Sequence, residues 1–115
     1  MGADLTGRYG VRVTTVYKVL RADEWAAAQA VERYEGSPDD LRDGFVHLST
    51  ASQLPGTLDR HFGGETGLML LTVDAEALGD SLRWEASAGG EAYPHYYGAL
   101  PMSAVTEATP VRSDQ

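Results

Sequence analysis

The feature that most constrains the fold is the segment 68–73, Leu-Met-Leu-Leu-Thr-Val, which is almost continuously apolar. It has the length of a strand and is far shorter than the ~20 residues that a membrane-spanning helix needs. A strand that is apolar at consecutive positions packs against protein on both of its faces. We therefore expect a central, doubly covered strand in which Leu70 and Leu71 are both buried.

Strand and helix signals alternate around this segment. Helix signals are capping residues and proline in a first turn, with glycine after the end. Strand signals are β-branched residues and period-two alternation. They predict strands over 11–20, 45–49, 82–86 and 104–111, a helix over 24–34 capped by Asp23 and ended by Gly36, and a helix from Thr50 or Ser52 to Phe62. They also predict short helical turns over 37–40 and 74–79, a loop over 88–90 and an irregular aromatic segment over 93–101.

The order of these elements predicts an α+β fold, with a small split or mixed β-sheet and two main helices. The length of 115 residues and the 43% of hydrophobic residues suffice for one core. We assign residues 11–111 to a single domain, 1–10 to a flexible leader and 112–115 to a frayed C-terminus. No signal peptide or membrane span is predicted, and cysteine is absent, so we expect a cytoplasmic protein without disulfides.

The charge argues against two classes of partner. The formal net charge is −8, and the nine Lys and Arg residues are dispersed along the chain. Nucleic acids and anionic membranes select clustered cations, so we expect neither as a partner. A small molecule with one or two anionic groups needs only one or two local cations and is the expected partner. The sequence does not indicate an oligomeric state.

Familiar catalytic motifs do not occur. The three histidines lack metalloprotease spacing, no Walker or dinucleotide glycine pattern is present, and there is no nucleophile elbow. We predict no metal site.

His47 is the first candidate site residue. Alternation places Phe45, His47 and Ser49 on one strand face, and Ser49 and Thr50 lie at a strand-to-helix junction. Such a junction offers hydroxyls and unpaired amides to a small ligand. The alternative is a core histidine that bonds a backbone carbonyl, and the sequence does not decide between the two.

A second candidate is the segment 93–98, Tyr-Pro-His-Tyr-Tyr-Gly, which contains His95 and Tyr97. Its rings suit a stacking wall with polar tips, or an aromatic plug over the sheet. Tyr17 and Lys18 form a third candidate, a ring beside a cation that suits a phosphate, with an ordinary edge-strand lysine as the alternative. For Arg83 and Glu85, which share a strand face, we favour a solvent-exposed salt bridge. For His61 we favour a structural role at a helix C-terminus.

These segments together resemble the bacterial family known as domain of unknown function 952. The resemblance runs from Val16 to about Val105. It is carried by Gly-Phe-Val-His-Leu-Ser-Thr over 44–50, Arg-Trp-Glu over 83–85, and Tyr-Pro-His-Tyr-Tyr-Gly over 93–98. The resemblance implies an ADP-ribosyltransferase-like fold, a split sheet that binds NAD in a central cleft.

The resemblance implies that NAD or another ADP-ribose-containing molecule binds in a cleft around His47 and His95, with NAD as a candidate substrate. The enzymatic version is ADP-ribosyl or glycosidic-bond transfer, in which His47 and His95 are the catalytic candidates. The ligand-binding candidates are Tyr17, Lys18, Ser49, Thr50 and Tyr97. The alternatives are a non-catalytic module for small ligands and a protein-interaction module.

Overall fold

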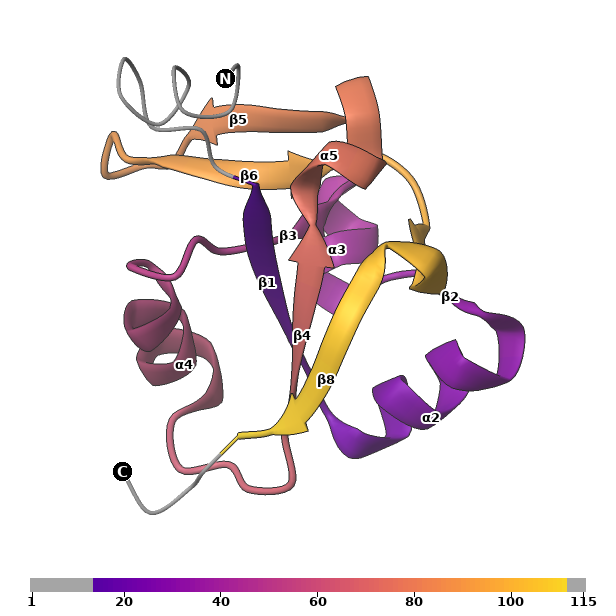
Figure 1. Ribbon diagram of the computed structural model, residues 1–115. Helices are drawn as coiled ribbons and strands as arrows, with labels where there is room; N and C mark the ends of the chain where they lie inside the picture. The colour runs from indigo at the N-terminus through magenta and orange to yellow at the C-terminus, as the bar shows by residue number, and fades with distance from the viewer. Residues whose placement is uncertain (1–13, 112–115) are drawn as a thin grey trace, which may run out of the picture.

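The computed structural model describes residues 14–111, and its architecture is α+β, as predicted. The expectations for residues 1–13 and 112–115 lie outside these residues. The elements in chain order are β1 (Thr15–Leu20), α2 (Ala22–Val31), β2 (Arg33–Tyr34), α3 (Pro38–Asp43), β3 (Val46–His47), α4 (Leu54–Phe62), β4 (Met69–Asp74), α5 (Ala75–Leu78), β5 (Leu82–Ala86), β6 (Ala92–Tyr96), β7 (Leu100–Pro101) and β8 (Val105–Pro110) (Figure 1). The two main helices of the prediction correspond to α2 and α4.

The strands form three small antiparallel sheets, with the orders β1-β4-β8, β3-β6-β5 and β2-β7. In Figure 1 the first sheet faces the viewer, and the hairpin of β5 and β6 crosses above it. An isolated bridge joins these two sheets. The Tyr17 amide donates to the Ser49 carbonyl at 2.8 Å, and the Ser49 amide donates to the Tyr17 carbonyl at 3.0 Å. The bridge brings the start of the chain's first strand to the candidate site.

The core lies on one face of the β1-β4-β8 sheet. Val16 opposes Val73 across the sheet, both are fully buried, and Leu20 and Leu71 are buried beside them. Side chains alternate along each strand, so the residues next to these four in sequence point to the opposite face of the sheet. The described residues include no helix that is long and apolar enough to cross a membrane.

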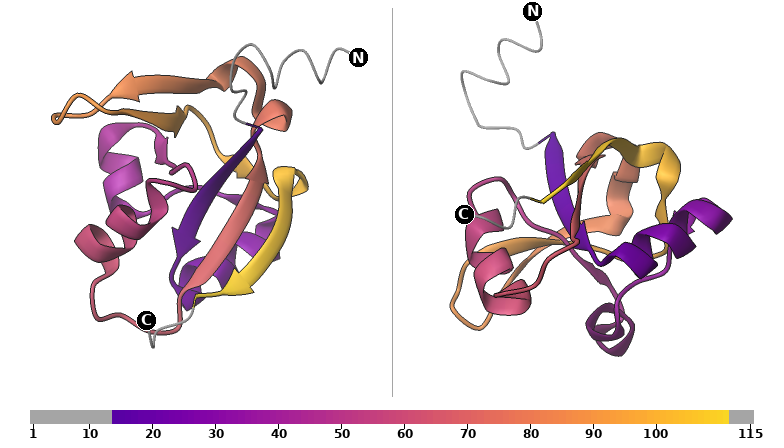
Figure 2. Two further views of the ribbon diagram at one scale, coloured as in Figure 1. Left: turned by 60° about the vertical axis from the view of Figure 1, so that its left-hand side comes forward. Right: turned by 90° about the horizontal axis from the view of Figure 1, so that it is seen from below.

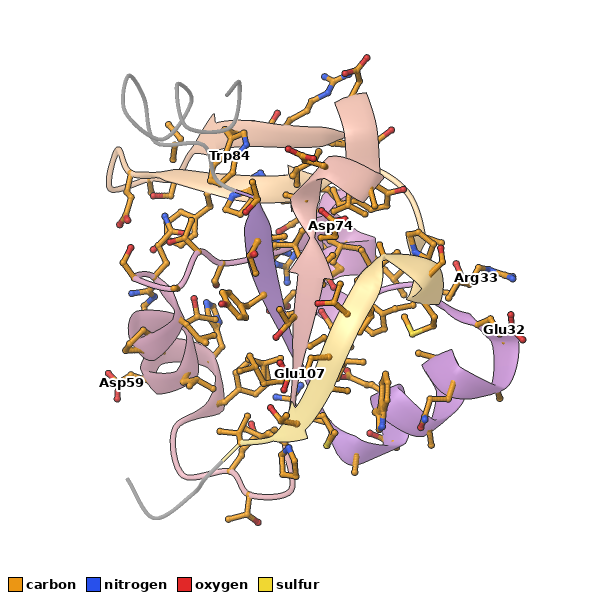
Figure 3. All side chains as sticks on the ribbon, in the orientation of Figure 1. Glu32, Arg33, Asp59, Asp74, Trp84 and Glu107 are labelled. Atoms are coloured by element: carbon orange, nitrogen blue, oxygen red, sulfur yellow. The ribbon has the colours of Figure 1, made fainter. Side chains whose placement is uncertain are left out.

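The central position of β4 confirms the prediction from its apolar run, but the expected burial of Leu70 is wrong. Leu71 is fully buried, whereas Leu70 is only partly buried. Leu70 shares its face with Thr72 and, on the neighbouring strand, with the exposed Glu107. Figures 1 and 3 show this face toward the viewer, with no helix in front of β4 or β8 and with Glu107 labelled on it. An apolar residue at this position therefore borders solvent.

The predicted bounds of the helix over 24–34 are wrong at both ends, since α2 spans Ala22–Val31. The structure starts α2 at Ala22, where the Arg21 amide donates to the Glu24 carboxylate at 2.8 Å, so Asp23 is not the cap. The helix ends at Val31 and is capped by Glu32, which adopts a left-handed conformation with φ of 63°; Gly36 does not end it. The chain then pairs at once as β2 with β7, and this long-range pairing overrides the local helix signal.

The prediction of an irregular segment over 93–101 is also wrong, because β6 and β7 occupy most of it. Proline is rare in a central strand because it cannot donate to a neighbour. Here the Pro94 carbonyl accepts from the Leu48 amide at 3.0 Å, just past the end of β3. The backbone nitrogen of Pro94 also faces β3. The hydrogen bond that this nitrogen cannot donate would therefore lie just past His47, where β3 ends.

Candidate functional site

A cavity of about 980 Å³ lies where the two larger sheets meet. Its lining residues come from strands β1, β3 and β6, from helices α3 and α4, and from the β5–β6 turn, among other segments. In the left view of Figure 2 these two helices and the hairpin gather on one side of the molecule. Five of the seven predicted site residues line the cavity, namely Tyr17, Lys18, His47, Ser49 and His95, whereas Thr50 and Tyr97 do not.

The structure brings His47 and His95 together, as predicted. They are direct partners in the antiparallel pairing of β3 with β6, so both side chains project from the same face. Their ring centroids are 5.5 Å apart. The register of this short pairing, which spans 48 residues of sequence, places both rings at one cavity.

His47 lies between two carboxylates. Its Nδ1 is 2.6 Å from Oδ1 of Asp40, and its Nε2 is 3.0 Å from Oδ2 of Asp43. The backbone amide of His47 also donates to Asp40, at 3.1 Å. A neutral imidazole donates from one nitrogen only, so both contacts are satisfied together when the ring is protonated. In that arrangement neither ring nitrogen is available to accept a proton from a ligand.

Asp40 connects His47 to Lys18. The Lys18 ammonium lies 3.0 Å from Oδ2 of Asp40 and donates to the His47 carbonyl at 3.0 Å. Burial by itself would raise the pKa of the Asp40 carboxyl, but the hydrogen bond from His47 and the charge of Lys18 outweigh it and hold that pKa well below its usual range. Lys18 is buried with Asp40, so the interpretation of an ordinary edge-strand lysine is wrong.

The local sequence explains how Asp40 reaches this position. Ser37 caps α3, and Pro38 occupies its first turn, as the sequence indicated. The Ser37 hydroxyl accepts from the Asp40 amide at 3.2 Å, and the Asp40 carboxylate accepts from the Ser37 amide at 2.9 Å. Gly44, with φ of 87°, then ends the helix and turns the chain directly into β3. The capping pattern was visible in the sequence, but the role of Asp40 at the site was missed.

His95 has a different environment. Its Nδ1 is 2.7 Å from Oε1 of Glu85, and the same oxygen accepts from the Tyr97 hydroxyl at 2.7 Å. These two hydrogen bonds lower the pKa of the Glu85 carboxyl, and the bond from His95 has the larger effect. Phe45 stacks on the His95 ring with centroids 4.0 Å apart. Among residues 14–111 no partner bonds Nε2 of His95, so this nitrogen is available to a ligand.

Two interpretations on β5 and β6 change accordingly. The proposed salt bridge between Arg83 and Glu85 is wrong, since Glu85 bonds His95 and the Arg83 guanidinium lies 5.2 Å from the Tyr97 ring centre. Tyr97 is 37% exposed and lies outside the cavity. Glu85 could have been identified as the partner of His95 only from the register of β5 with β6, which the sequence does not give.

Ser49 and Thr50 make protein contacts at the start of α4. The buried Ser49 hydroxyl lies 2.7 Å from that of Thr57. The Thr50 hydroxyl accepts from the Gln53 amide at 3.2 Å, and the Gln53 side chain accepts from the Thr50 amide at 3.1 Å. This reciprocal bonding is that of a capping box, although regular helix begins only at Leu54, with Pro55 in its first turn.

The chemistry that these groups offer is proton transfer and polar binding. The described part of the chain holds no group of three or more metal-ligating side chains arranged for an ion. What it holds is a pair of adjacent histidines, each oriented by a carboxylate, and one of them retains an open nitrogen. An imidazole oriented in this way is a common general acid or base.

Comparison with known proteins gives the family. The family described as "Protein of unknown function (DUF952)" matches residues 19–108. The crystal structure of protein CC0527 from Caulobacter crescentus is similar, at 47% identity and a TM-score of 0.83, over 86% of this chain and 87% of that one. The solution structure of CC0527 matches at 46% identity and a TM-score of 0.77, over 89% of this chain and 90% of that one. No curated protein matches the chain. The match over most of its length shows that this chain belongs to the DUF952 family.

Proposed function

We propose that the cavity binds a small molecule carrying ribose and phosphate groups, with NAD or another ADP-ribose-containing molecule as the candidate, in an ADP-ribosyltransferase-like fold. The observation that carries this proposal is the pair of carboxylate-oriented histidines, His47 and His95, at one cavity of about 980 Å³. That volume is at the upper end of the range of small-molecule sites. The rings of Tyr17 and Tyr93 line the same cavity and offer surfaces on which a base can stack.

In the enzymatic version His95 accepts the proton. Its Nδ1 is held by Glu85, which leaves Nε2 to take a proton from an acceptor hydroxyl. The hydroxyl oxygen bonds to C1 of the ribose while the bond from C1 to the nicotinamide nitrogen breaks. The bond's electron pair leaves with nicotinamide, and the proton passes to His95. Glu85 acts here as a positioning residue, because it fixes the tautomer and orientation of the ring.

A non-catalytic binding module is the second candidate. Both nitrogens of His47 and the ammonium of Lys18 are already bonded to protein oxygens, so this half of the cavity offers no free acid or base. The two candidates share a ligand and differ in turnover alone.

Ligand binding is tested by thermal unfolding of the protein with NAD, ADP-ribose, adenosine and inorganic phosphate. A ligand at 100 times its Kd stabilises the folded protein by ~2.7 kcal/mol. We expect NAD and ADP-ribose to stabilise the wild type. Failure of every one of these probes to stabilise it at millimolar concentration would contradict the proposal.

Turnover is tested by measuring nicotinamide release from NAD. We expect His95→Gln to lower release about 100-fold or more while ligand binding changes little, since general-base catalysis contributes about 10²–10⁴-fold. Glu107→Gln, on the exposed face of the other sheet and outside the cavity, is the control and should leave release unchanged. Stabilisation by NAD without nicotinamide release would support the binding module.

A further inference from the structure

We propose that Arg60 and Tyr93 form an anion-binding subsite on the α4 wall of the cavity, which takes the phosphate portion of the ligand. The inference rests on the proposed function and deepens it, because it moves the phosphate contact from Lys18 to a different element.

The balance of charge in the cavity points to Arg60. Four Lys and Arg side chains line the cavity, and three of them are paired with carboxylates: Lys18 with Asp40, Arg21 with Glu65, and Arg42 with Asp39 and Asp43. Arg60 makes no ion pair with any of residues 14–111. It is therefore the one cavity-lining Lys or Arg in this part of the chain whose charge remains to be matched by a ligand.

Arg60 is also held in place. Its Nη2 donates to the Tyr93 hydroxyl at 3.0 Å, from the helix to the opposing strand. Its Nη1 lies 3.1 Å from the point that a Cβ on Gly56 would occupy, so the missing side chain at Gly56 makes room for the guanidinium against its own helix. The hydrogen bond to Tyr93 orients the guanidinium before a ligand arrives, which lowers the entropy cost of binding.

The remaining donors suit an oxyanion. A guanidinium has five N–H donors in a planar fork, and the bond to Tyr93 uses one of them. The Tyr93 hydroxyl accepts that bond and keeps its own proton to donate. Glu91 is the carboxylate on the adjoining turn, and it already accepts from the Gln53 amide group at 3.0 Å. A guanidinium beside a hydroxyl donor binds the anionic oxygens of phosphate or pyrophosphate more strongly than it binds an uncharged ligand group.

The test measures calorimetric binding of ADP-ribose, adenosine and inorganic pyrophosphate to the wild type and to Arg60→Gln, Tyr93→Phe and Arg83→Gln. Arg83 is the matched control, since it is exposed, lies outside the cavity and also makes no ion pair with the described residues. We expect ADP-ribose to bind Arg60→Gln about 10- to 100-fold more weakly than the wild type, the range for loss of a hydrogen bond to a charged group. Tyr93→Phe should show a smaller loss, while adenosine should bind all four proteins alike.

The outcomes separate this subsite from the proposed function. Equal ADP-ribose affinity in wild type and Arg60→Gln would overturn the subsite and leave the proposed function standing. Pyrophosphate binding that is lost in Arg60→Gln, without any ADP-ribose binding, would support the subsite and contradict the proposed ligand. An equal loss in Arg83→Gln would show a general charge effect and overturn the subsite. Absence of binding by every probe to the wild type would overturn both.

Discussion

At the scale of single residues, Asp40 organises half of the site. One carboxylate accepts from the Lys18 ammonium, the His47 ring, the His47 amide and the Ser37 amide, and it is 2% exposed. Because burying a lone charge is costly, such a group persists only while all its partners are present. Substitution of Asp40 should therefore affect both stability and the placement of His47.

Asp40→Asn is expected to lower the free energy of unfolding at pH 7 by ~3–5 kcal/mol, since it leaves the buried Lys18 ammonium without its counter-charge. Urea denaturation measures this loss. Asp39→Asn, at the exposed neighbouring position, is the control and should cost less than about 1 kcal/mol. Equal losses in the two variants would contradict the role assigned to Asp40.

The same substitution should change the pH dependence of stability. The pKa of Asp40 in the folded protein is held below the ordinary unfolded value of about 3.9. Its contribution is therefore fully present above that value and is lost as the pH falls through the folded pKa. We expect the difference in stability between wild type and Asp40→Asn to shrink from pH 5 toward pH 2. A difference that is constant over this range would show that Asp40 has an ordinary pKa.

At the scale of elements, the short strands depend on their partners. β3 has only two residues, Val46 and His47, and is defined by pairing with β6 and by the turn from α3. β4, by contrast, lies between two strands and contributes Leu71 and Val73 to the core. Because side chains alternate between the two faces of β4, Leu71 is fully buried while its neighbour Leu70 is only partly buried.

Leu71→Ala is expected to destabilise the protein by ~2–5 kcal/mol, because it opens a cavity in the core. Leu70→Ala, on the partly exposed face, is the matched control. We expect it to lower the free energy of unfolding by only ~1 kcal/mol, because the Leu70 side chain buries less apolar area than that of Leu71. Chemical denaturation of the two variants gives both values. If Leu70→Ala proves as costly as Leu71→Ala, the open face of β4 must be covered in solution.

At the scale of the whole molecule, charge governs the choice of partner. The net charge is −8, and several arginines of the described residues are already paired with carboxylates, among them Arg21, Arg33 and Arg42. Few cations are left to displace counterions from a nucleic acid. A small ligand that needs one matched cation remains compatible with this surface.

We therefore predict that the protein binds neither duplex DNA nor tRNA with a Kd below about 10⁻⁴ M at physiological salt, the weak limit of non-specific binding. Fluorescence anisotropy with labelled duplex and tRNA measures this directly. Saturable binding at micromolar protein would refute the prediction and would favour a nucleic acid as the partner of the cavity.

The sequence alone predicted features that depend on neighbours along the chain. The strand over 82–86, the helical turn that starts at Ser37 and the α+β class followed from periodicity and capping, which act over a few residues. The family resemblance and the unusual segments around His47 and His95 also pointed to five of the residues that line the cavity.

Only the tertiary structure decided which partners these residues have. Pairing of β3, β6 and β5 brings Glu85 to His95, α3 brings Asp40 to His47 and Lys18, and α4 brings Arg60 to Tyr93. Each contact joins separate elements, and none has a periodic signal. Their geometry follows from strand register and helix docking, which are determined by burial of the whole core and not by the local sequence.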